Sequence, residues 1–195
     1  MSTLSVDMIE PVGSTLTLGQ SGDTVTIPAG GTFVNSGTAT GFGSGNLYAS
    51  QWRMTTDFTS DKTPITLNWE AVDSPLGYGN KGAAMTQALG IFTFPATGIW
   101  LIDYNLMFSP SASATGVMSI YTTHNDATYA IASEAAQTGY YLSDSMSCSY
   151  IMNVSSTSTH KVRFHIVWST AQVSQTTRGN ADINETFVTF TRLSA

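Results

Sequence analysis

The stretch ALGIFTFPATGIWLIDYNLMF, residues 88–108, decides the fold of this chain. Two apolar runs flank the sequence PATG at residues 95–98. Pro95 cannot donate to a β-ladder and Gly98 tolerates positive φ, so this sequence predicts a turn. In the second run every other residue is apolar, namely Trp100, Ile102, Tyr104, Leu106 and Phe108. This period-two pattern predicts a β-strand with one face on a hydrophobic core.

The opposite face of that strand is partly apolar as well. Its side chains are Ile99, Leu101, Asp103, Asn105 and Met107. A sandwich strand that faces water is normally polar on its outward side. We therefore predict that these five residues lie at an interface between copies of the chain, which makes the protein a homo-oligomer.

The same segment resembles the signature of the C1q/TNF-like trimeric jelly rolls, roughly G-x-F-x-x-P-x-x-G-x-Y-x-F-x-Y. The matching residues are Gly90, Phe92, Pro95, Gly98, Trp100, Ile102 and Tyr104. Residues 154–168 and 183–195 resemble further strands of that family, although Thr189 replaces a family glycine and Arg192 interrupts the apolar tail. The resemblance implies a jelly roll that forms a homotrimer around a threefold axis. It also implies binding and assembly in place of catalysis.

The rest of residues 51–195 is consistent with an all-β sandwich. Alternating patterns predict about eight strands, with turn sequences between them and no long helix. Besides the segment above, these patterns lie at residues 65–71, 117–122, 129–133, 147–154, 162–168 and 187–193.

Residues 1–50 differ in composition from the rest of the chain, because Gly, Thr and Ser dominate there. Short apolar alternations recur around Leu16, Val25 and Phe33, which is typical of β-solenoids or intertwined β-prisms. Such units bury too little surface alone, so we predict an attachment and trimerisation segment that gains from three-chain wrapping. Residues 13–43 also resemble segments of structural proteins of marine tailed phages. That resemblance implies a virion protein, displayed on the particle surface and bound to other virion proteins through this segment.

Composition excludes several classes of function. The net charge is −6 with only seven Lys and Arg residues, so the chain cannot neutralise many phosphates and nucleic-acid binding is not expected. No apolar run reaches the ~18 residues of a membrane span, and membrane insertion is not expected. The N-terminus is polar, which predicts synthesis in the host cytoplasm. The single cysteine, Cys148, excludes an internal disulfide and is expected to be a small core residue without a reactive thiol.

The sequence carries no motif of a known catalytic site. Residues 41–45, GFGSG, do not have the order of a nucleophile elbow, and no HExxH, Walker or paired-cysteine pattern occurs. We expect no enzyme activity. His124, His160 and His165 are expected to be solvated or interface histidines, since alternation places His165 on the polar face of its strand.

Two ligand sites are predicted in loops. Tyr78, Tyr140 and Tyr141 are candidate anchors for a host-surface glycan, because a loop tyrosine offers a flat ring and a hydroxyl at low entropic cost. Asp182, Asn184 and Glu185 cluster before the last strand and could supply oxygen ligands for Ca²⁺. No other cofactor is expected.

Together these features predict a non-enzymatic virion structural protein. It would be a trimeric capsid decoration or short fibre, with a C-terminal knob that contacts host-surface glycans. A tail-fibre tip or a stand-alone carbohydrate-binding module for receptor recognition is the alternative. A glycan-cleaving depolymerase would need facing carboxylates, of which the chain supplies few.

Overall fold

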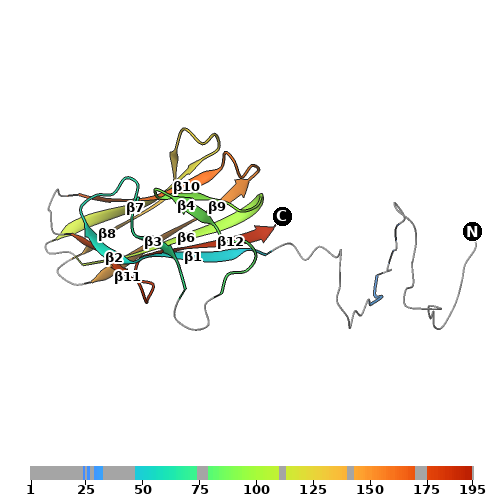
Figure 1. Cartoon of the computed structure of the whole chain (residues 1–195), viewed down its shortest axis with the longest axis horizontal. Coiled ribbons are helices and arrows are strands. Elements are labelled where there is room, and N and C mark those ends of the chain that lie inside the picture. Colours follow the sequence, from blue (N-terminus) through green and yellow to red (C-terminus); the bar gives the residue numbers. More distant parts are fainter. Residues whose placement is uncertain are drawn as a thin grey trace, which may run out of the picture. The chain divides into compact units, whose positions relative to one another are not determined.

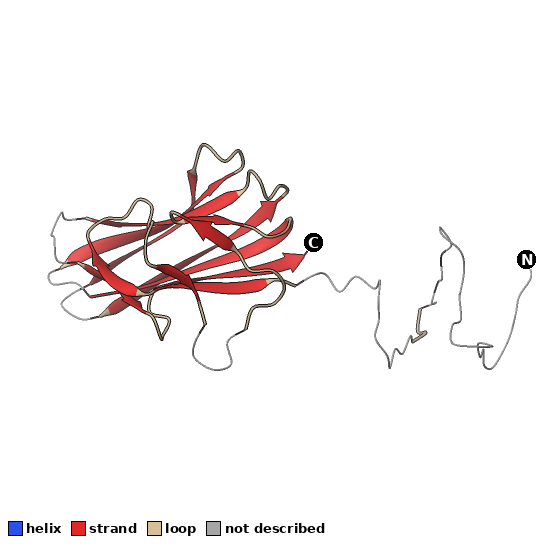
Figure 2. Cartoon of the chain, viewed as in Figure 1, coloured by secondary structure: helices blue, strands red, loops and turns tan. Residues whose placement is uncertain are grey.

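The computed structural model describes residues 24, 26, 29–32, 47–73, 79–109, 113–139, 143–169 and 175–194. The chain divides into two units, Met1–Phe42 and Gly43–Ala195. Every element of the described residues is a strand of the second unit (Figures 1 and 2). The N-terminal alternations around Leu16, Val25 and Phe33 lie outside the described residues.

The strands form two antiparallel sheets. In the first, which has seven strands, β9 (Asp144–Val154) pairs with one edge of β6 (Gly98–Ser109), and β12 (Phe187–Ser194) and β11 (Thr176–Asn180) pair with the other. Beyond them lie β1 (Ala49–Met54), β3 (Trp69–Ala71) and β2 (Thr56–Thr59). The second sheet has five strands, in the order β4 (Thr86–Ala88), β5 (Ile91–Thr93), β10 (Lys161–Trp168), β7 (Ala114–Thr123) and β8 (Ala130–Gly139). The predicted all-β jelly-roll architecture is confirmed.

The signature segment behaves as its pattern predicts, with one refinement. The side chains of β6 are alternately buried and half-exposed along its length. However, β5 belongs to the second sheet and β6 to the first, so the turn at residues 95–98 carries the chain between sheets instead of closing a hairpin. Gly98 has a φ of 132°, and a Cβ there would lie 2.2 Å from the carbonyl oxygen of Ser194. Only glycine fits this crossing.

Aromatic side chains fill the space between the sheets. The ring of Phe92 is central, with centroids 5.5 Å from Trp69, 5.4 Å from Phe164 and 5.4 Å from Phe190. Edge-to-face and tilted contacts of this kind add to the burial of the rings themselves. The inward residues of β6, β10 and β12 thus form one core together with residues of neighbouring elements. Its members include Phe94, Trp100, Ile102, Tyr104, Phe108, Met118, Ile120, Val162, Ile166 and Val188.

Several sequence expectations were wrong in detail. Only Trp69–Ala71 of the predicted strand at 65–71 is a strand, because Asn68 has a φ of 65° and Leu67 is exposed. The sequence patterns did not predict β1, β2 or β11.

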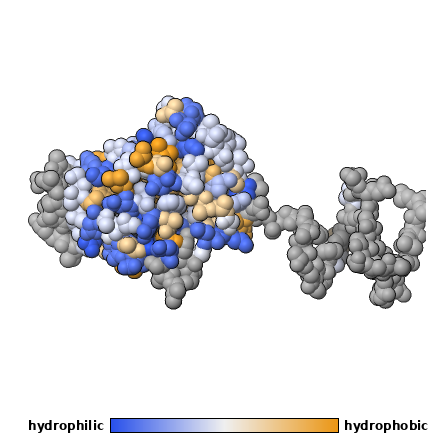
Figure 3. Space-filling view, viewed as in Figure 1, coloured by the Kyte–Doolittle hydropathy of each residue, from blue (hydrophilic) through white to orange (hydrophobic). Residues whose placement is uncertain are grey.

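On the face shown in Figure 3, apolar surface occurs as separate patches among polar ones.

Candidate functional site

The predicted interface residues all lie on the outward face of the first sheet. Ile99, Leu101, Asp103, Asn105 and Met107 are half-exposed, and they alternate with the buried side chains of β6. Cross-strand partners share a face, so β12 adds Phe187, Thr189 and Thr191, and β9 adds Ser145, Ser147, Ser149 and Ile151. We call this set of residues the outward face.

One end of the outward face is apolar. Leu101 pairs with Ile151 on β9, whose side chain is 58% exposed. Ile99 lies two residues before Leu101 on the same side of β6. Leu193, 48% exposed, lies at a register shift of β12, between Arg192 and the residue that pairs with Ile99, Ser194. Four aliphatic side chains therefore lie together on a sheet surface that is exposed to water in a single copy of the chain.

The centre of the outward face is polar and hollow. Asp103 lies between Ser149 on β9 and Thr189 on β12. A shallow hollow of about 280 Å³ surrounds it, and Tyr104, Asn105, Ser147 and Cys148 complete the lining. Burial raises the pKa of the Asp103 carboxyl, which makes its neutral form easier to reach.

A second hollow lies toward the other end of the face. It measures about 460 Å³ and is lined by Asn105–Met107, Ser143–Ser147, Glu185 and Phe187. Small serine side chains at alternate positions of β9 leave this space open. The carboxylate of Asp144 accepts hydrogen bonds from Gln137 Nε2 at 2.9 Å and from the Ser145 amide at 2.8 Å.

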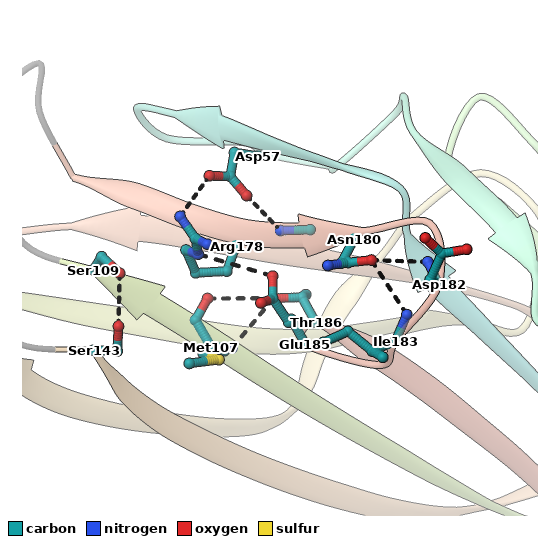
Figure 4. A network of polar contacts seen from close by, with 11 residues as sticks. Asp57, Met107, Ser109, Ser143, Arg178, Asn180, Asp182, Ile183, Glu185 and Thr186 are labelled. Carbon is teal, nitrogen blue, oxygen red and sulfur yellow. Dashed lines mark hydrogen bonds and ion pairs between the residues drawn. The ribbon is translucent and has the colours of Figure 1, made fainter. Parts of the chain in front are cut away.

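Polar contacts fix the loop that borders the second hollow (Figure 4). Arg178 Nη1 lies 2.8 Å from Asp57 Oδ2, and its Nε lies 3.8 Å from Glu185 Oε2. Thr186 Oγ1 accepts a hydrogen bond from the Met107 amide and donates one to the Met107 carbonyl. These bonds join the end of β6 to the start of β12, so the rim of the hollow is held in place.

The predicted ligand residues are placed as follows. Tyr78, Tyr140 and Tyr141 lie outside the described residues. Of the three calcium candidates, Glu185 faces Arg178, and Asn184 donates to Gln51 Oε1 at 3.3 Å. The backbone amide of Asp182 is capped by Asn180 Oδ1. These contacts point in different directions, and the calcium site stays a prediction.

The cysteine is unreactive in this environment. Cys148 is half-buried against the core, and burial raises its pKa to about 11. The thiol is therefore protonated at neutral pH and a poor nucleophile.

Two of the three histidines, His160 and His165, are less exposed than the sequence suggests, whereas His124 is exposed. His160 lies edge-on to His124, with ring centroids 4.7 Å apart, and its ring nitrogens contact Ser155 and Thr159 hydroxyls. His165 is only 5% exposed and stacks on Tyr121, so of the two expected settings, solvated or at an interface, the solvated one was wrong. The ring of Tyr121, on the neighbouring strand β7, covers the imidazole of His165.

We expect His165 to make the fold acid-sensitive. Burial, with a smaller effect of Arg163, lowers its pKa from 6.5 to about 4. Between these values the unfolded chain binds more protons than the folded one, so stability falls as pH drops from about 6.5 toward 4. Thermal unfolding midpoints at neutral and acid pH should differ less in His165→Gln than in the wild type. An equal loss in both proteins would contradict this assignment.

Comparison with known proteins identifies the fold. No family model and no curated protein matches the chain. Among solved structures, murine APRIL at pH 5.0 is similar, with a TM-score of 0.55 at 12% identity over 75% of this chain and 99% of that one. Eiger TNF from S. frugiperda gives 0.53 at 13% identity, over 76% and 94%. These likenesses show a TNF-like jelly roll.

Sequence reasoning missed the contribution of β9. Ser145, Ser147 and Ser149 alternate with Met146, Cys148 and Tyr150, and this alternation is visible in the sequence. What the sequence does not reveal is the pairing partner. The register of β9 on β6 places those serines beside Asp103, Asn105 and Met107.

Proposed function

We propose that the chain is a non-enzymatic structural protein of a tailed-phage virion surface, which assembles as a homotrimer through the outward face. The observation that carries the assembly is the apolar end of that face, formed by Ile99, Leu101, Ile151 and Leu193. Burying these side chains between copies recovers the hydrophobic free energy that a lone subunit forgoes. The resemblance to C1q/TNF-like trimers supplies the stoichiometry, since this family assembles about a threefold axis.

The two parts of the chain have separate roles in this proposal. Residues 51–195 form a projecting knob, and residues 1–50 attach it to other virion proteins. The Gly- and Thr-rich sequence of residues 13–43, which resembles marine phage structural proteins, supports this division. We favour a capsid decoration or short fibre. A tail-fibre tip is the alternative.

A binding role is supported over a catalytic one by the lining of the two hollows. Serine hydroxyls lie beside Asp103 in one and beside Asp144 and Glu185 in the other. Among the described residues, neither lining includes a histidine or a lysine, the usual bases that activate a serine nucleophile. Hydroxyls and carboxylates of this kind suit hydrogen bonding, here to a second copy of the chain across the proposed trimer contact.

Antibody labelling tests the virion role. Gold-labelled antibodies to residues 51–195 should decorate intact particles of the source phage at regular positions in electron micrographs. Label on capsid faces would favour the decoration, and label at the tail end would favour the alternative. Intact particles that carry no label would refute the virion role without bearing on the trimer.

Acid should strengthen the assembly through Asp103. The hollow around it is lined by neutral side chains, so covering the carboxylate without a partner is costly unless it takes up a proton. A group whose pKa rises on association binds protons as the trimer forms, so association strengthens as pH falls. We expect the trimer dissociation constant to be lower at about pH 5 than at about pH 7.5, and Asp103→Asn to remove most of this difference. An unchanged pH dependence in the variant would exclude Asp103 as its source.

A further inference from the structure

The outer face of the second sheet carries a layer of aromatic and cationic side chains. Its members are Tyr121 on β7, Tyr129 just before β8, and Arg163 and His165 on β10. We call them the Arg163 layer. Register places Arg163 directly opposite Tyr121 on the neighbouring strand. The layer lies on the second sheet, whereas the outward face, which we propose to be buried in the trimer, lies on the first.

The four side chains contact one another in sequence. The guanidinium carbon of Arg163 lies 4.0 Å from the ring centroid of Tyr129 and 5.5 Å from that of Tyr121. The Tyr121 ring stacks on the imidazole of His165, with centroids 3.9 Å apart and an angle of 18°. A guanidinium held on aromatic rings is already oriented, so a ligand that binds it orders few further rotamers.

The hydrogen-bonding capacity of Arg163 is unused. Within the part of the chain that the structure describes, no carboxylate pairs with this guanidinium. Its Nε is buried without a hydrogen-bond partner, as are the Tyr129 hydroxyl and His165 Nε2. Three unpartnered polar atoms in one layer are unusual, because buried polar groups are normally satisfied.

Neighbouring charged groups are occupied elsewhere. Lys161 donates to Thr93 Oγ1 and to the Thr157 carbonyl, at 3.1 and 2.9 Å. Glu134, on the next strand, accepts from Ser119 Oγ at 3.3 Å. Burial, with a smaller effect of Asp126, raises the pKa of the Tyr129 hydroxyl, and Asp126 forms no ion pair with Arg163. Since His165 is neutral at pH 7, the positive charge of the layer is that of the guanidinium alone.

We propose that the Arg163 layer binds the carboxylate of an acidic sugar. The planar guanidinium suits two parallel hydrogen bonds to a carboxylate, and the flanking tyrosine rings suit the C–H face of a sugar ring. A single cation on a chain of net charge −6 favours an isolated uronate-like unit over a dense polyanion. This inference rests on the proposed virion-surface role and names a ligand class for the host-glycan contact expected from the sequence, and it does not depend on the trimer.

Titration with sodium glucuronate tests the site. We expect saturable binding of the full chain, followed by calorimetry or by NMR shifts of tyrosine rings, and at least tenfold weaker binding for Arg163→Gln. Arg163→Lys should also weaken binding, because an ammonium cannot make the paired contact. The matched control is Lys81→Gln, which removes an exposed positive charge outside the Arg163 layer and outside both hollows, and should leave the affinity unchanged.

Two further ligands separate the contribution of the carboxylate from that of the sugar ring. Glucose, which lacks the carboxylate, should bind at least tenfold more weakly than glucuronate. Sodium acetate, which lacks the sugar ring, should also bind more weakly. The proposal is overturned if glucuronate shows no saturable binding, if Arg163→Gln binds it as the wild type does, or if acetate binds equally well. The trimer is measured separately by sedimentation, so its failure would be distinguishable.

Discussion

Ile151→Asp is expected to convert the proposed trimer into monomers. Ile151 is on β9, at the apolar end of the outward face, and pairs directly with Leu101. Burying a side chain of this size is worth about 1.5–3 kcal/mol, and a trimer contains three copies. The assembly constant should therefore fall by about a thousandfold or more, since every 1.4 kcal/mol is tenfold. Sedimentation velocity over a concentration series measures the change.

Ile131→Asp is the matched control for this variant. Ile131 is 53% exposed, close to the 58% of Ile151, and it lies on β8, the last strand of the second sheet. The two substitutions thus add the same charge to similarly exposed isoleucines on different sheets. Ile131→Asp should leave the trimer intact. Equal effects of both variants on assembly would contradict the assignment of the outward face.

The double variant Glu70→Gln/Asp73→Asn is expected to lose about 1–3 kcal/mol of folding free energy, because the Arg53 side chain is buried while those of Glu70 and Asp73 are 33% and 77% exposed. Arg53 is fully buried, and its Nε and Nη2 lie 2.8 Å from Glu70 and 2.7 Å from Asp73. Neutral amides keep the shape of both side chains but remove the negative charges. Removing both carboxylates from beside a buried guanidinium is destabilising. Urea unfolding of the variant and the wild type measures the difference.

An exposed ion pair provides the comparison. Asp57→Asn breaks the pair with Arg178, in which both side chains are about 40% exposed, and should cost at most about 1 kcal/mol. Adding Arg53→Met to the double variant should recover much of the loss, because the uncompensated charge is then gone. If the triple variant is no more stable than the double, the destabilisation does not come from buried charge.

The strands of the core were predictable where one face is purely apolar. In β6, β9 and β10, residues such as Trp100, Met152 and Phe164 recur at period two and are buried as the pattern requires. Short strands were not predictable. β2 carries only one large apolar residue, Phe58, and is held in the sheet by β11 and by the bonds of Asp57. Such a strand owes its conformation to its neighbours.

The candidate site was predictable only in part. The five outward residues of β6 could be named, because a partly apolar outward face can be recognised from the sequence of a single strand. The hollows depend on cross-strand register, which places Ser147 and Thr189 next to Asp103 and Asn105. The Arg163 layer was hidden for the same reason. Arg163 and His165 read as a polar face, and only the pairing with β7 brings Tyr121 against them.

The oligomeric state of the full chain tests the central claim most directly. Sedimentation equilibrium at micromolar concentration and neutral pH should give a species of three 20.7 kDa chains, about 62 kDa, that dissociates only on strong dilution. A folded 20.7 kDa monomer that persists across the concentration range would mean that the outward face needs no second copy. That result would contradict the proposed assembly.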